Sequence, residues 1–322
     1  GDALSGLADG SHDYVATATD DAGNSASATH TWLVDLTDPS VTIDSTPSDP
    51  DNDDTPTFTF SISDGESSVS AECAMNWDDY AACTSPFTSA ALAEGNNIFK
   101  VRAVDAAGNI VGTQYSWSLD LTDPAVAISD TPAAETNSDA ADMTVTSSDG
   151  GSGLASTTCD LDGVAQADCG GVLAGLADGS YTFTATATDA AGNSASASYT
   201  WLVDTVAPTV SINGPATPNS SDSASFTVTS ADASSGLAST TCTLDTVAVT
   251  CGDAASGLSD GSHDYVATAT DDAGNSASAS YTWLVDITNP TVSISDTPAA
   301  ETNSQAADVT VTSADGGSGL AS

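Results

Sequence analysis

The 322-residue chain carries 45 acidic side chains against one lysine and one arginine, which gives a formal net charge of −43 at pH 7. A chain this acidic repels nucleic acids and anionic membrane surfaces, because binding to phosphate groups needs clustered Lys and Arg. No apolar run is long enough to cross a membrane. We therefore expect no nucleic-acid partner and no direct membrane insertion in this segment. Disordered acidic tails share this composition, but they do not keep aromatic and β-branched residues at fixed positions with strand alternation.

One stretch recurs four times along the chain. Each copy has a D-(D/A)-A-G-N turn, an alternating strand that ends in Trp, and then an Asp and a Pro a few residues later. The four tryptophans lie 85, 84 and 82 residues apart, at Trp32, Trp117, Trp201 and Trp283. Self-similarity at a fixed period indicates a tandem array.

In chain order, the period predicts five segments, which we call repeats 1 to 5. Repeat 1 (1–36) is the back half of a repeat, repeats 2 (37–121), 3 (122–205) and 4 (206–287) are complete, and repeat 5 (288–322) is a front half. Because the sequence starts and stops inside repeats, we expect a segment of a longer repetitive polypeptide. A joint is named after the two repeats that it connects.

Within a repeat, short strands separated by turn residues are typical of an all-β sandwich. Strand F of repeat 3 alternates most clearly, with Tyr181, Phe183, Ala185 and Ala187 on one face and threonines on the other. We expect the first face to lie in the core. The predicted strands of repeat 3 are A (125–128), B (143–147), C (156–161), C′ (166–169), E (172–173), F (181–188) and G (195–203).

The six cysteines form three pairs at equivalent places, without histidine partners: Cys73/Cys83, Cys159/Cys169 and Cys242/Cys251. This pattern favours disulfides in an oxidising compartment over zinc sites. Each pair flanks a short hairpin, and closing such a loop stabilises the fold by roughly 2–3 kcal/mol in the chain-entropy model. We therefore expect a secreted, extracellular or cell-surface protein.

The repeat resembles the bacterial Ig-like domains of large secreted surface and adhesin-type proteins. The matching pattern is C-x-(L/N)-D-G…C, then G-L-A-D-G-S-Y-T-F-T-A-T-A-T-D-A-A-G-N, then W-x-V-D-x-T-x-P, and it recurs over essentially the whole chain. The resemblance implies an all-β, tandem array of seven-stranded Ig-like β-sandwiches joined head to tail, often with calcium at the joints.

In such a sandwich, the B–C and F–G loops lie at the pole where the chain enters from the preceding domain. The resemblance thus gathers acidic residues from the linker and both loops at each joint. Three or four carboxylates with backbone carbonyls suit calcium, which takes about six to eight oxygen ligands. We predict calcium as the cofactor, and the alternative that Asp merely suits turns in a saline medium stays open. The residues are Asp35, Asp38, Asp64 and Asp105 at joint 1/2; Asp120, Asp123, Asp149 and Asp189 at joint 2/3; Asp204, Asp232 and Asp271, beside Asp272, at joint 3/4; and Asp286 and Asp315, beside Asn289, at joint 4/5.

The three histidines occupy ordinary strand positions, and no Ser/His/Asp or Cys/His set with supporting context accompanies them, so we expect no catalytic site. We predict an adhesin-like structural stalk or fibre segment, stiffened by calcium, whose partners are neighbouring repeats, copies of itself and a surface target. One alternative is a filament or sheath subunit, in which the half-domains 288–322 and 1–36 of neighbouring copies complement each other by strand donation. Another is the accessory array of a secreted polysaccharide-degrading enzyme.

Overall fold

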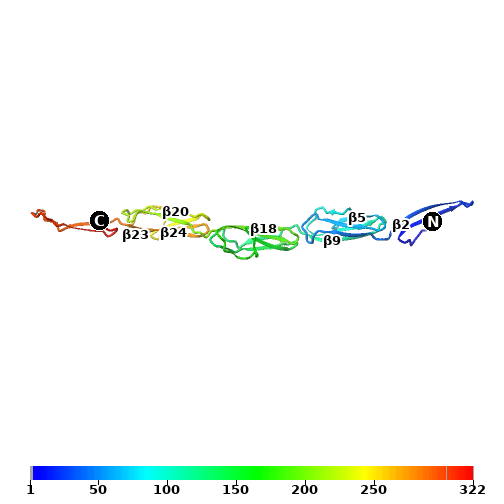
Figure 1. The fold of residues 1–322 in the computed structure, drawn as a ribbon, viewed down its shortest axis with the longest axis horizontal. Coiled ribbons are helices and arrows are strands. Elements are labelled where there is room, and N and C mark those ends of the chain that lie inside the picture. The colour runs from blue at the N-terminus through cyan, green and yellow to red at the C-terminus, as the bar shows by residue number, and fades with distance from the viewer. Residues whose placement is uncertain (1–2, 302, 322) are drawn as a thin grey trace. The chain divides into compact units, whose positions relative to one another are not determined.

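The computed structural model describes residues 3–301 and 303–321, so the predicted repeats 1 and 5 are described except at residues 1–2, 302 and 322. Over these residues the protein consists of strands, turns and loops without any helix (Figure 1). No helix of the described residues could therefore span a lipid bilayer. The chain divides into two compact units. Unit 1 comprises Gly1–Ala127, Val145–Cys159 and Ala185–Ala197, and unit 2 comprises Ile128–Thr144, Asp160–Thr184 and Ser198–Ser322.

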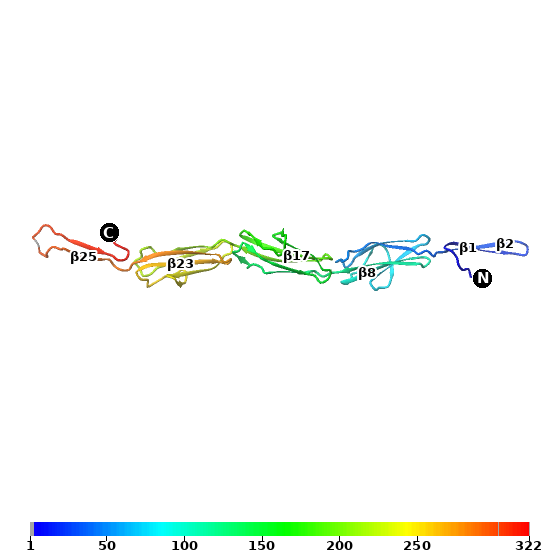
Figure 2. The ribbon, with the colours of Figure 1, turned by 90° about the horizontal axis from the view of Figure 1, so that it is seen from below.

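Repeat 1 is a single antiparallel hairpin of β1 (Gly10–Thr19) and β2 (Ser25–Val34), which lie side by side in Figure 2. The D-D-A-G-N sequence forms the turn between them, with the Gly23 N–H donating to the Asp20 carbonyl. Tyr14 is 54% exposed, whereas Tyr265, at the equivalent position of repeat 4, is 1% exposed. The hairpin therefore presents to solvent a face that is core in a complete repeat.

Repeat 2 is a sandwich of two sheets with strand orders β3-β4-β7 and β6-β5-β8-β9. Alternation places Phe58 of β4 and Phe99 of β8 on facing inner surfaces, where their rings stack at 4.1 Å and Trp117 closes the core at 1% exposure. Its seven strands match the predicted number: β3 (Ser40–Ser45), β4 (Thr57–Ser63), β5 (Val69–Met75), β6 (Ala81–Cys83), β7 (Phe87–Thr88), β8 (Gly95–Asp105) and β9 (Ile110–Leu119).

Repeat 3 confirms the predicted F strand, because Phe183, Ala185 and Ala187 are all buried. The return strand C′ differs from the prediction: it begins at Val164, directly after a two-residue turn in which Asp162 and Gly163 both have positive φ. Such a turn lets the chain pair again at once, so residues 166–169 lie beyond the strand. The strands are β10 (Ala125–Ser129), β11 (Glu135–Thr136), β12 (Ala140–Ala141), β13 (Thr144–Ser148), β14 (Leu154–Leu161), β15 (Val164–Ala165), β16 (Leu173–Ala174), β17 (Gly179–Asp189) and β18 (Ser194–Val203), of which β11 and β12 were not predicted.

Repeat 4 has six strands, one fewer than predicted, in a β19-β20 sheet and a four-stranded sheet with the order β22-β21-β23-β24. The additional pairing that β7 makes in repeat 2 is reduced to an isolated bridge between Ala224 and Ala255. Phe226 stacks on Tyr265 at 4.1 Å, and Trp283 is 1% exposed. In repeat 5, β25 and β26 pair as a two-stranded sheet. The bounds are β19 (Thr209–Asn213), β20 (Thr227–Ala231), β21 (Leu237–Leu244), β22 (Val247–Val249), β23 (Gly261–Asp271), β24 (Ser276–Val285), β25 (Thr291–Ser295) and β26 (Thr310–Ala314).

The predicted disulfides are confirmed. Cys73 is bonded to Cys83 and Cys242 to Cys251, and Cys159 and Cys169 are disulfide-bonded as well. The first bond links the neighbouring strands β5 and β6, so it closes a hairpin within one sheet rather than tying the two sheets together.

Candidate metal centres at the repeat joints

The F–G loop of each repeat is built around the Asp that ends strand F. In repeat 3, Asp189 Oδ1 accepts hydrogen bonds from the N–H groups of Gly192 (2.7 Å) and Asn193 (2.8 Å). Gly192 has φ +103°, a conformation that a residue with a side chain rarely adopts. The D-A-A-G-N sequence thus fixes one carboxylate at the loop. Asp105 is held in the same way, and Asp271 Oδ1 accepts from the Asn275 N–H while the Gly274 N–H donates to the Asp271 carbonyl.

The Asn of that loop connects two repeats, a role that the sequence interpretation missed. Its side-chain N–H groups donate both to the Asp of its own loop and to a backbone carbonyl of the linker from the preceding repeat. The donors and their linker acceptors are Asn109 to Asp35 (3.1 Å), Asn193 to Asp120 (2.8 Å) and Asn275 to Asp204 (2.7 Å).

The linker Asp lies against the B–C loop of the repeat that follows. Asp120 Oδ2 accepts from the Ser152 N–H at 2.5 Å, while Asp149 Oδ2 accepts from Gly151 and Gly153 of the same loop. A Cβ on Gly151 would lie 2.6 Å from the Cγ of Asp120, closer than real Cβ contacts. Glycine at this position therefore allows the carboxylate to rest on the loop backbone.

The linker, the B–C loop and the F–G loop each contribute one carboxylate at three of the joints. One oxygen from each of these three residues lies within 4.8 Å of the others. All nine residues come from the predicted set. Asp38 and Asp123, the second acidic residues of the linkers, are exposed and lie outside these groups, as do Asp272 and Asn289. At joint 4/5, Asp286 and Asp315 form no such group of three in the described part of the chain. The triads are Asp35, Asp64 and Asp105; Asp120, Asp149 and Asp189; and Asp204, Asp232 and Asp271.

The linker Asp and the F–G loop Asp of each triad are buried, the B–C loop Asp is half-buried, and part of their acceptor capacity is unused. Asp35 is 6% exposed, Asp120 2% and Asp204 0%. Within the triads, three buried carboxylate oxygens have no hydrogen-bond partner among the described residues. Leaving such an oxygen without a donor costs free energy, so each is a position where a cation fits. These oxygens are Oδ2 of Asp35, Oδ2 of Asp64 and Oδ1 of Asp149. Outside the triads, Oδ1 of Asp315 and Oε2 of Glu135 are also buried without a hydrogen-bond partner among the described residues.

The chain offers no positively charged side chain to these sites. Its only two basic residues lie on β8, where Arg102 pairs with Glu72 at 2.6 Å and Lys100 lies over the Trp77 and Tyr80 rings. A counter-ion for the triads must therefore come from solution.

Hydrogen bonds lower the pKa of the linker carboxylates Asp120 and Asp204. The Ser152 side chain lowers the pKa of Asp120, and the Ser235 side chain lowers that of Asp204, in both cases against the effect of burial. Burial raises the pKa of Asp105, but hydrogen bonds from Asn109 outweigh it and the net shift is downward. These groups are therefore available as anionic ligands.

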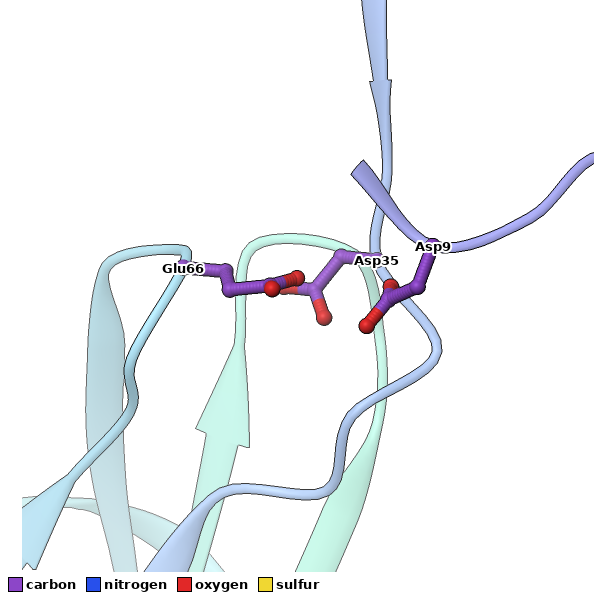
Figure 3. A group of neighbouring side chains, drawn as sticks. All are labelled: Asp9, Asp35 and Glu66. Carbon is purple, nitrogen blue, oxygen red and sulfur yellow. The ribbon is translucent and has the colours of Figure 1, made fainter. Parts of the chain in front are cut away.

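Joint 1/2 contains a second acidic group that the sequence interpretation missed. One oxygen each of Asp9, Asp35 and Glu66 lies within 4.8 Å of the others, and Figure 3 shows the Asp35 carboxylate between the other two. Burial, followed by the charge of Asp9, raises the pKa of Glu66. Asp9 also accepts hydrogen bonds from the Leu36 N–H and the Thr37 hydroxyl, both at 2.8 Å.

The acid before strand F, which is Asp9 in repeat 1, recurs in the three complete repeats. In each case it accepts a hydrogen bond from the hydroxyl of a linker threonine. The recurring L-(A/S)-(D/E)-G sequence was the signal for this contact. The pairs are Glu94 with Thr122, Asp178 with Thr205 and Asp260 with Thr288.

A family model of a bacterial Ig-like domain matches residues 122–205, and one of bacterial Ig-like domains of group 3 matches residues 172–257. Residues 122–257 therefore carry bacterial Ig-like domains, as the repeat motifs predicted. No curated protein sequence matches it.

Solved structures with a similar fold include a tetra-tandem repeat from the extending region of a large adhesion protein (19% identity, 88% of this chain and 83% of that one, TM-score 0.34). Fibronectin(III)-like modules of Clostridium thermocellum CbhA are also similar (19% identity, 51% and 94%, TM-score 0.34). A third is Drosophila N-cadherin EC1-4 (13% identity, 86% and 84%, TM-score 0.25).

Proposed function

We propose that this chain is a structural segment of an extracellular surface protein, in which calcium bound at the repeat joints restrains successive Ig-like domains. The observation that carries the proposal is the recurrent triad of carboxylates from the linker, the B–C loop and the F–G loop. Tandem domains of one family, disulfide bonds and a large acidic excess all suit an exported protein with a mechanical, non-catalytic role.

The chemistry of the triad favours a hard divalent cation. The ligands are carboxylate oxygens, supplemented by backbone carbonyls of the loops, which is the donor set that calcium prefers. Without a cation, three carboxylates within 4.8 Å repel one another and push the linker away from the loops. Calcium would remove this repulsion and connect both repeats through the same ion.

The test compares the full chain in calcium with the chain in EDTA, by thermal unfolding and by small-angle X-ray scattering. We expect calcium to raise the melting temperature and to narrow the distribution of chain dimensions. Asp189→Asn should reduce both effects, whereas Asp123→Asn, an exposed carboxylate of the same joint, should leave them unchanged. The proposal fails if EDTA alters neither quantity.

A second candidate function is the filament or sheath subunit assembled by strand complementation. The observation in its favour is the exposure of apolar residues on the two-stranded sheets of repeats 1 and 5: Val15 56%, Val292 72%, Ile294 62% and Val311 61%. Sedimentation over a range of concentrations distinguishes the two candidates. Concentration-dependent polymers that dissociate when Ile294 becomes Asp would favour the subunit, and a monomer at every concentration would exclude it. The accessory-array alternative rests on the sequence resemblance alone.

A further inference from the structure

Joint 1/2 differs from the other joints at one position of the B–C loop. Repeat 2 has Glu66 where repeats 3 and 5 have Gly151 and Gly317, and where repeat 4 has Ser234. Glu66 thereby adds an acid beside Asp9 and Asp35 (Figure 3). Like charges at this distance destabilise the joint unless a cation lies between them.

The shared residue, Asp35, has the acceptor capacity that such a cation needs. Asp35 is 6% exposed, and among the described residues its buried Oδ2 has no hydrogen-bond partner, while Oδ1 accepts only from the Thr37 N–H at 3.1 Å. The linker residues Asp120, Asp204 and Asp286 instead use Oδ2 to accept from a loop serine. At joint 1/2, the equivalent Ser67 N–H donates to Asp64, so Asp35 Oδ2 has no donor in the part of the chain that the structure describes.

Charge balance separates this joint from joint 2/3. The Asp120 triad carries a formal charge of −3, so one divalent cation leaves −1. At joint 1/2, the two overlapping groups contain five different carboxylates and carry −5, so one divalent cation leaves −3 and two leave −1. Neither of the chain's two basic side chains lies there, since Arg102 pairs with Glu72 and Lys100 lies against aromatic rings.

We propose that joint 1/2 binds a second calcium ion between Asp9, Asp35 and Glu66, next to the ion of the Asp35 triad. This inference rests on the proposed function, because the two ions share the Asp35 carboxylate. A carboxylate has about four lone-pair positions, and one hydrogen bond to Thr37 leaves enough of them for two cations. The joint would thus be a two-ion site within an array of one-ion sites.

The test counts bound calcium on the full chain by native mass spectrometry after treatment with EDTA and titration with calcium chloride. Glu66→Ser installs the residue that joint 3/4 has at this position, and it should bind one ion fewer than the wild type. Ser234→Glu installs the acid at joint 3/4, where Asp178 is equivalent to Asp9, and it should bind one ion more. Far-UV circular dichroism checks that both variants keep their strands.

The outcomes separate this inference from the proposed function. If the wild type and Glu66→Ser bind the same number of ions, while Asp105→Asn binds fewer, the joints hold calcium but the second site does not exist. If the wild type binds no calcium, the proposed function fails and the second site fails with it. A loss in Glu66→Ser together with a gain in Ser234→Glu establishes the site.

Discussion

The close approach of the linker to the B–C loop can be tested with a single methyl group. Gly151→Ala places a Cβ within 2.6 Å of the Asp120 Cγ, so the carboxylate has to move. The hydrogen bond that it accepts from the Ser152 N–H would then be lost or lengthened. Gly150→Ala is the matched control, because a Cβ there meets no atom within 4 Å.

The expected loss of stability in Gly151→Ala depends on the kind of hydrogen bond that is broken. A hydrogen bond to a charged group contributes about 1.5–3 kcal/mol. Replacing Gly by Ala also stabilises a protein by about 0.4–1 kcal/mol, because it lowers the conformational entropy of the unfolded chain, but both variants share that gain. The difference between them should therefore be about 1.5–3 kcal/mol, or roughly 10- to 150-fold in a local opening equilibrium. Joint 3/4 indicates a value near the lower end of this energy range. There the residue equivalent to Gly151 is Ser234, which has a Cβ, and Asp204 still accepts a hydrogen bond from the Ser235 N–H at 3.0 Å.

Hydrogen exchange measured by mass spectrometry reports this opening locally. A peptide that covers the B–C loop of repeat 3 should exchange faster in Gly151→Ala than in Gly150→Ala, and peptides from the repeat 4 core should not change. Calcium affinity at joint 2/3 should fall in parallel. Equal exchange in the two variants would show that the contact between linker and loop does not stabilise the joint.

Three further predictions concern a linker carboxylate, a disulfide and the two basic residues. Because the pKa of Asp204 is lowered by folding, its ionised form stabilises the folded state fully above pH 3.8, the ordinary pKa value. This stabilisation is lost as the pH falls through the lower pKa of the folded state. The midpoint of unfolding should therefore drop in that acidic range, and it should drop less in Ser235→Ala. Replacing Cys242 and Cys251 with serine should cost roughly 2–3 kcal/mol in urea unfolding, and an unchanged midpoint would contradict the loop-closure argument. Trypsin should leave the folded chain intact for hours, because Lys100 and Arg102 both lie within β8; rapid cleavage would contradict the strand pairing there.

The strands that could be predicted are those in which one strong pattern governs every residue. Strand F alternates large or small apolar residues with threonine, and Phe183, Ala185 and Ala187 are buried as expected. The error at C′ came from the turn, because positive φ at both Asp162 and Gly163 starts the return strand earlier than the cysteine spacing indicated. The short strand β11 has no pattern of its own, since its two residues pair with β18 through the backbone.

At the joints, too, only part of the arrangement could be predicted from the sequence. The Ig-like topology predicted which loops meet, and Asp35, Asp64 and Asp105 do lie together. Asp9 and Glu66 were missed for different reasons. Asp9 lies 26 residues before Asp35 in the sequence, and only the β1–β2 hairpin brings the two together. Glu66 could have been found as the acid that replaces the Gly or Ser of the other repeats.

Neutral donors and a cation stabilise the joints in different ways, and this difference predicts how calcium dependence varies along the chain. The Asn193 amide orients the linker at joint 2/3 whether or not a metal is bound, but a dipole cannot cancel the net charge of the triad. Calcium dependence should therefore follow the number of carboxylates in the close acidic groups, with joint 1/2 (five) above joints 2/3 and 3/4 (three each). Hydrogen exchange of the F–G loops in calcium and in EDTA measures this order. A calcium effect of equal size at all three joints would show that the amide donors, and not the acidic residues, control the joint.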